Sequence, residues 1–142
     1  MTAAAGFVLD PRLAADSLML AEGPLSQLRL MDDARFAWLV LVPRVADATE
    51  WIDLDGARQR LLLAEVNRAG RLLRATGPCA KLNIGALGNI VRQLHVHVVA
   101  RTEDDAAWPG PVWGSGPMQR LARGVRESRL EALRTALAAM PD

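Results

Sequence analysis

Residues 93–99 read QLHVHVV and hold both histidines of the chain, His95 and His97. Because side chains alternate between the two faces of a β-strand, an extended segment places Gln93, His95 and His97 on one face and their apolar neighbours on the other. Imidazole can attack, hold or protonate a phosphate near neutral pH, whereas a strand needed only for packing would carry valine or isoleucine here. The row predicts a functional site. The structural alternative is a pair of hydrogen-bonded histidines at a sheet surface.

A second alternating segment, residues 81–91, reads KLNIGALGNIV and runs into the histidines. Its glycines, Gly85 and Gly88, predict that it forms a hairpin with the histidine strand through a glycine-containing turn. They do not form a Gly-x-Gly-x-x-Gly element between a strand and a helix, so the pattern does not indicate a dinucleotide-binding loop.

Taken together, residues 83–99 resemble the histidine triad (HIT) family. The signature of that family is His-φ-His-φ-His-φ-φ, where φ is apolar, usually preceded by an Asn-x-Gly strand and a Gly-Gln or Gly-Asn turn. The chain reproduces this layout at matching spacing, but Gln93 stands where the first triad histidine is expected. In this resemblance His95 takes the position of the nucleophile and His97 the position that contacts phosphate. Gln93 can orient a neighbour through hydrogen bonds, but it cannot take up a proton as imidazole does.

The resemblance implies nucleotidyl-transfer chemistry. His95 would attack the α-phosphorus of a nucleoside phosphate derivative, and water would then resolve the nucleotidyl-histidine. His97 and the amide of Asn89 would hold the phosphate oxygens as charge builds up on them. By family position Gln93 and Asn83 lie beside the site, although ordering of the hairpin explains Asn83 equally well.

An acidic residue that follows an early strand often binds the ribose hydroxyls in HIT proteins. The resemblance therefore assigns Asp32 or Asp33 to this role, and the sequence does not choose between them. The structural alternative for both is a solvated turn. Arg101, directly after the histidine strand, is a further candidate for attracting phosphate, with an exposed strand-end charge as the alternative.

The predicted function is therefore a nucleotide hydrolase or nucleotidyl transferase, with a nucleotide or nucleotide-like small molecule as its partner. The alternative is a non-catalytic nucleotide-binding sensor or adaptor, because the first triad histidine is lost, and a purely structural module is a weaker third. We expect no cofactor and no metal site. Zinc needs three or four ligands, and this chain has two histidines and one cysteine, Cys79.

Composition limits the other classes of function. The chain has 142 residues, of which 51% are hydrophobic, and this predicts a single HIT-like domain over residues 1–142. A formal net charge of +1 gives no basic surface for bulk nucleic acid. No apolar run reaches the roughly 20 residues that cross a bilayer. The single Cys79 excludes an internal disulfide and is typical of a reducing compartment, so we expect a cytoplasmic protein.

The periodicity of the chain predicts an α+β class, with an antiparallel sheet and one central and one C-terminal helix packed against it. HIT domains have this architecture. The expected strands are 7–9, 17–22, 25–30, 36–42 and the two site strands, and the expected helices begin at Pro11, Asp55 and Pro117, the last carrying an apolar stripe of Leu130, Leu133, Leu137 and Met140.

The C-terminal segment, residues 104–142, begins with a loop rich in tryptophan and proline. Trp108 or Trp113 in this loop could flank a nucleobase, cover a partner subunit or plug the end of the sheet. Most HIT proteins are dimers with C-terminal segments near their sites, so the resemblance implies a homodimer.

Overall fold

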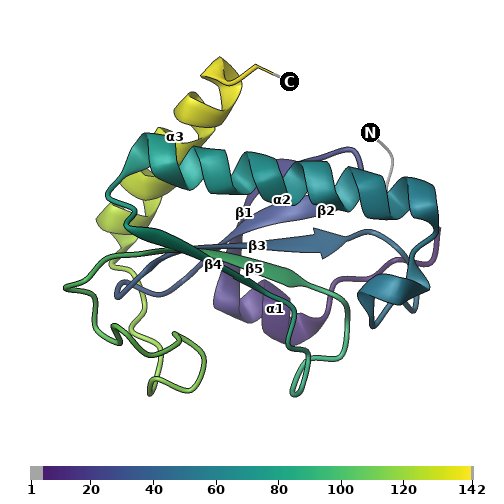
Figure 1. The fold of residues 1–142 in the computed structure, drawn as a ribbon, viewed down its shortest axis with the longest axis horizontal. Helices are drawn as coiled ribbons and strands as arrows, with labels where there is room; N and C mark the ends of the chain where they lie inside the picture. Colours follow the sequence, from purple (N-terminus) through teal and green to yellow (C-terminus); the bar gives the residue numbers. More distant parts are fainter. Residues whose placement is uncertain (1–4, 142) are drawn as a thin grey trace.

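The computed structural model describes residues 5–141, and Figure 1 shows their arrangement. In chain order the elements are α1 (Pro11–Asp16), β1 (Ser17–Glu22), β2 (Ser26–Met31), β3 (Ala37–Pro43), the 3₁₀ helix η1 (Trp51–Asp53), α2 (Gly56–Thr76), β4 (Lys81–Gly85), β5 (Val96–Arg101) and α3 (Arg123–Ala139).

The strands form one five-stranded sheet in the order β1-β2-β3-β5-β4, and every neighbouring pair is antiparallel. The middle strand β3 and its inner neighbour β5 are buried on both faces, apart from Ala37. The continuous apolar run of β3 suits a strand in this position, because neither face of the strand is in contact with water. The predicted α+β class and antiparallel sheet are confirmed.

Helix α2 covers one face of the sheet (Figure 1), and its sequence shows why. Asp55 caps the helix by accepting a hydrogen bond from the amide of Arg58 at 2.8 Å. The buried residues Leu62, Val66, Ala69 and Leu73 follow helical spacing and pack against the sheet. The C-terminal helix α3 packs against α2 and β1 and adds Leu133 to the same core.

The opposite face of the sheet carries α1 (Figure 1) and a second, smaller hydrophobic cluster. This cluster is formed by Phe36, Trp38 and Val99 with Met31, Val40 and Val112. The loop that follows β5 supplies Val112 and packs Trp113 against it. The histidines therefore lie on the face that α2 leaves open.

The structure differs from the expected elements at three places. Residues 7–9 form no strand, because the carbonyl of Val8 and the amide of Asp10 are bound by the Gln93 side chain and not by a neighbouring strand. The histidine strand begins only at Val96, and residues 86–95 form a loop. This loop is held away from the sheet ladder, since the amide of Leu94 donates to the carbonyl of Ala48 at 2.9 Å.

The third difference is the start of the last helix. Helix α3 begins at Arg123, whereas Pro117 was expected to open it. The preceding residues form no helix, and they bond to the turn after β2. The amide of Leu121 donates to the Asp32 carboxylate at 3.0 Å, and the carbonyl of Gln119 accepts from the amide of Ala34 at 2.6 Å. Within residues 5–141, no helix is both long and apolar enough to span a membrane.

Candidate active site

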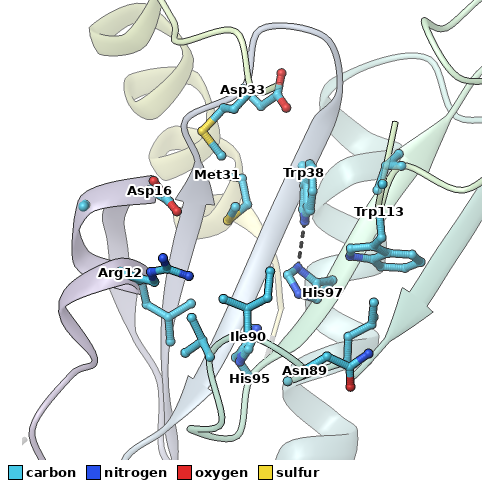
Figure 2. A pocket seen from close by; sticks show the side chains of 18 of the residues that line it. Arg12, Asp16, Met31, Asp33, Trp38, Asn89, Ile90, His95, His97 and Trp113 are labelled. Atoms are coloured by element: carbon cyan, nitrogen blue, oxygen red, sulfur yellow. Dashed lines mark hydrogen bonds between the residues drawn. The ribbon is translucent and has the colours of Figure 1, made fainter. Parts of the chain in front are cut away.

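A cavity of about 660 Å³ opens on the α1 face of the sheet, and both histidines line it (Figure 2). Its walls come from α1, the end of β2, Trp38 of β3, the loop 86–95 and the loop after β5. The cavity therefore joins segments that are far apart in the sequence around His95 and His97.

His97 is held as a neutral hydrogen-bond donor. The indole Nε1–H of Trp38 donates to His97 Nδ1 at 2.9 Å. Indole nitrogen can only donate, so Nδ1 must carry a lone pair and the ring proton lies on Nε2. Burial, together with the charge of neighbouring His95, lowers the pKa of His97 to about 3. His97 therefore presents an N–H group and no positive charge at neutral pH.

His95 has the opposite tautomer. Its Nδ1 lies 2.7 Å from the carbonyl oxygen of Gln93. A carbonyl can only accept, so Nδ1 donates, and in the neutral ring the free lone pair lies on Nε2. The His95 and His97 rings are 4.9 Å apart between centroids, at 76° to each other. One pocket thus contains a nitrogen that can attack and, beside it, an N–H that can bind a phosphate oxygen.

Trp113 forms an aromatic wall next to His97. Its ring stands edge-on to the imidazole at a centroid distance of 5.5 Å (Figure 2). Gly85 permits this approach, because a Cβ atom there would lie 3.2 Å from the indole. The indole Nε1 of Trp113 is buried and has no hydrogen-bond partner among the described residues. Trp108 does not line the cavity and instead packs its ring under the Arg101 guanidinium, 5.7 Å away.

Arg101 is not exposed, contrary to one of the two expectations for it, and it organises the loop that carries Trp113. Its guanidinium is 1% exposed and binds Asp105 through two hydrogen bonds of 2.7 and 3.0 Å. It also donates to Asn83 Oδ1 and to the carbonyl of Gly110, each at 2.8 Å. The Arg101 hydrogen bonds hold the pKa of the Asp105 carboxyl well below its usual range. Asn83 therefore orders this loop and does not line the cavity.

The two candidate aspartates lie in different places. Asp33 is fully buried and lines the cavity, whereas Asp32 turns toward Leu121 and does not. Arg35 donates to both carboxylate oxygens of Asp33, at 3.0 and 2.8 Å. Burial alone would raise the pKa of Asp33, but the hydrogen bonds from Arg35 hold it below its ordinary value. Asp33 is thus a fixed carboxylate in the cavity wall.

The two remaining predicted residues also separate. Asn89 is exposed and lines the cavity beside Gly88, whose φ of 69° is easily reached only by a residue without a Cβ. Gln93 does not line the cavity. Its Oε1 accepts from the amide of Asp10 at 2.9 Å and its Nε2 donates to the carbonyl of Val8 at 2.8 Å. Gln93 therefore anchors the segment that leads into α1.

Several lining residues were not found from the sequence. Trp38 looked like an ordinary core residue of β3, and only a three-dimensional contact reveals its bond to His97. Arg12 and Asp16 lie on α1, which no sequence motif connects to the histidines. Arg35 follows Asp33 by two residues, and this spacing of opposite charges was the one available signal. Among residues 5–141, no three His, Cys, Asp or Glu side chains gather as metal ligands.

Replacing Trp38 by phenylalanine should allow His97 to populate both of its neutral tautomers. The variant keeps an aromatic ring but removes the N–H that bonds Nδ1. We expect the Nδ1 and Nε2 resonances of His97, measured by nitrogen NMR at neutral pH, to move toward each other as both tautomers become populated. Trp108→Phe, outside the cavity, is the matched control and should leave them unchanged. Unaltered His97 resonances in Trp38→Phe would show that another contact sets the tautomer.

Comparisons with known proteins show a family and a fold that match this architecture. The family model described as HIT domain matches residues 12–104. A histidine triad protein from Bradyrhizobium japonicum is 43% identical, with a TM-score of 0.89 over 93% of this chain and 98% of that chain. One from Sinorhizobium meliloti is also 43% identical, with a TM-score of 0.88 over 92% and 96%.

A third solved structure, a histidine triad protein from Marinobacter aquaeolei, is 37% identical, with a TM-score of 0.90 over 95% of this chain and 98% of that chain. No match was found among curated proteins. The family model covers more than half of the chain, and the solved relatives share its whole architecture. The chain therefore belongs to the histidine triad family.

Proposed function

We propose that this protein is a nucleotide hydrolase or nucleotidyl transferase that acts on the α-phosphate of a nucleoside phosphate derivative, with His95 as the nucleophile. The observation that carries the proposal is the pair of opposite tautomers, His95 with a free Nε2 lone pair and His97 with an Nε2–H, in one cavity. Proteins of the HIT family bind nucleotides in general, which supports the choice of substrate.

In the first step, His95 Nε2 forms a bond to phosphorus and the bond to the leaving group breaks with its electron pair. Positive charge develops on the His95 ring, and the Gln93 carbonyl oxygen at Nδ1 stabilises it. His97 donates from Nε2 to a phosphate oxygen that gains negative charge. Because burial keeps His97 uncharged, it does not oppose the charge that forms on its neighbour.

In the second step, water or another acceptor attacks phosphorus, its proton leaves to solvent, and the N–P bond breaks. The electron pair returns to His95 Nε2, which restores the starting enzyme. With water as acceptor the reaction is hydrolysis. With another hydroxyl or amine it is nucleotidyl transfer.

Two further residues are proposed to bind the substrate. Asn89 is exposed at the edge of the cavity, so its amide can reach a phosphate oxygen. Asp33 lines the cavity, and its Oδ2 accepts from Arg35. A carboxylate oxygen has two lone pairs, which leaves one for a ribose hydroxyl.

We also propose that the protein is a homodimer. Strand β4 forms one edge of the sheet, so one side of its backbone has no partner strand among the described residues. Its side chain Ile84 is 53% exposed, and Ile90 of the following loop is 77% exposed. Apolar side chains beside an unpaired edge favour association of two chains, which sedimentation at micromolar concentration measures.

The proposed activity is tested by incubating the purified protein with nucleoside phosphoramidates, dinucleoside polyphosphates and nucleotidyl sugars, and by measuring released nucleotide. We expect at least one class to release a nucleoside monophosphate, and the class that reacts identifies the leaving group. Release of inorganic phosphate in place of nucleotide, or no release from any class, would contradict attack at the α-phosphorus.

A further inference from the structure

Arg12 is a cation in the cavity wall whose side chain has no hydrogen-bond or ion-pair partner among the residues that the structure describes. Its side chain lines the cavity from α1 and makes no ion pair or side-chain hydrogen bond among residues 5–141 (Figure 2). A guanidinium prefers planar, two-point contacts with phosphate or carboxylate, and it stays charged at any physiological pH. Its position in the wall of a cavity is one from which it can reach a bound anion.

The other charged residues of the cavity wall are already paired. Asp33 and Arg35 form an ion pair at 2.8 Å, and Asp16 pairs with Arg120, also at 2.8 Å. Their charges largely cancel within the wall. The charge of Arg12 is not cancelled in this way, so the cavity favours an anion near α1.

The backbone that carries Arg12 is held at both ends of α1. Before the helix, Gln93 binds the backbone at Val8 and Asp10. After it, Arg120 donates to the carbonyl of Ala15 at 2.7 Å. Although the Arg12 side chain itself is exposed, its attachment point is therefore fixed relative to the cavity.

The place of Arg12 differs from the place where the histidines act. In Figure 2 Arg12 and Asp16 come from α1 on one side of the cavity, and His97 and Trp113 lie on the other. A phosphate that His97 holds for attack by His95 therefore lies apart from an anion beside Arg12. A substrate that satisfies both places carries two phosphate groups.

We propose that Arg12 binds a second phosphate group of the nucleotide substrate, and that Gln93 is a positioning residue that keeps α1, and with it Arg12, at the cavity. This inference rests on the proposed function. The second phosphate belongs either to a polyphosphate chain or to a phosphorylated ribose, and the same contact serves both. The residue that departs from the triad signature thus contributes to substrate selection through the segment that it anchors.

The test compares ligands that differ by one phosphate. Binding of AMP, ADP and adenosine 3′,5′-bisphosphate, and of the guanosine series, is measured by calorimetry in a His95→Ala background, so that no ligand is consumed. We expect the second phosphate to strengthen binding by about tenfold, or about 1.4 kcal/mol, in the diphosphate or in the bisphosphate. Adding Arg12→Gln should remove this gain and leave the affinity for the monophosphate within about threefold.

Two further variants complete the experiment. Arg71→Gln makes the same change of charge at an exposed position of α2, on the opposite face of the sheet, and should leave the gain intact. Gln93→Ala should reduce the gain without changing monophosphate affinity, and should speed hydrogen exchange in residues 8–16. If Arg12→Gln removes the gain in affinity only for the diphosphate, the substrate carries a polyphosphate chain. If it removes the gain only for the bisphosphate, the substrate carries a phosphorylated ribose.

Other outcomes overturn the inference. If the second phosphate adds nothing, or if Arg12→Gln weakens all ligands equally, Arg12 has no separate phosphate site. If Gln93→Ala speeds exchange but leaves the gain unchanged, Gln93 has only a structural role. If the wild type releases nucleotide and Arg12→Gln alters this release for no substrate, the inference about Arg12 is overturned and the proposed function is not. Absence of any nucleotide binding and release overturns the proposed function as well.

Discussion

Replacing His95 by alanine should abolish nucleotide release, with a loss of about 10³-fold or more, while nucleotide affinity stays within about tenfold. The reason is that the variant removes the lone pair that attacks phosphorus, but His97, Asn89 and the cavity walls remain. Turnover assays and equilibrium binding on the same preparation measure the two effects separately.

His97→Ala is the companion variant. It removes the N–H that contacts the phosphate before and during transfer, so we expect both affinity and rate to fall. Catalysis by His95 is contradicted if both variants bind nucleotide as the wild type does and none of the three proteins turns over any substrate. That result would indicate a non-catalytic nucleotide-binding sensor or adaptor.

The largest effect on stability is expected from Arg101→Met. Arg101 is 1% exposed, and its removal leaves the Asp105 carboxylate, 7% exposed, without its cation. Breaking a buried ion pair by removing one partner costs about 3–5 kcal/mol of unfolding free energy. Denaturant unfolding measures this cost. Trp113 should also become more accessible to a fluorescence quencher, because Arg101 and Asp105 hold the loop that carries it.

Arg58→Met provides the matched control. Arg58 also pairs with an aspartate, Asp55, at 2.8 Å, but the two side chains are 51% and 57% exposed. Exposed pairs contribute about 0–1 kcal/mol, so this variant should unfold close to the wild type. If the two arginine variants lost equal stability, the Arg101 network would not have the structural role assigned to it. Asp105→Asn, which removes the charge but keeps the shape, provides a second measurement if Arg101→Met does not fold.

Much of the fold could be predicted because local signals coincide with the tertiary structure. Helix α2 has a capping aspartate, a helical apolar stripe and a terminating Gly77, and all three appear in the sequence. Strand β3 is a continuous apolar run and lies in the middle of the sheet. The errors lie where distant segments compete with local pattern. Residues 93–95 alternate like a strand, but contacts with the N-terminal segment and Ala48 hold them in a loop.

The site shows the same division. His95 and His97 were expected to share a site, and they line one cavity. Which nitrogen of each ring carries the proton could not be predicted, because Trp38 and the Gln93 carbonyl decide it through contacts in space. Asn83 and Arg101 were candidates on their residue type. In the structure the Arg101 guanidinium donates a hydrogen bond to the Asn83 amide oxygen, and the two side chains hold a loop in place.

Nucleophilic attack by His95 is tested by trapping the covalent intermediate that it forms. A slowly reacting nucleotide derivative is mixed with the wild-type protein, the reaction is stopped in denaturant at neutral pH, and the intact protein and its peptides are weighed by mass spectrometry. We predict one nucleotidyl group per chain, located on His95, lost on acidification and absent from His95→Ala, because a phosphorus–nitrogen bond is labile in acid. A reactive substrate that leaves no adduct under single-turnover conditions, or an adduct on His97, would contradict nucleophilic attack by His95.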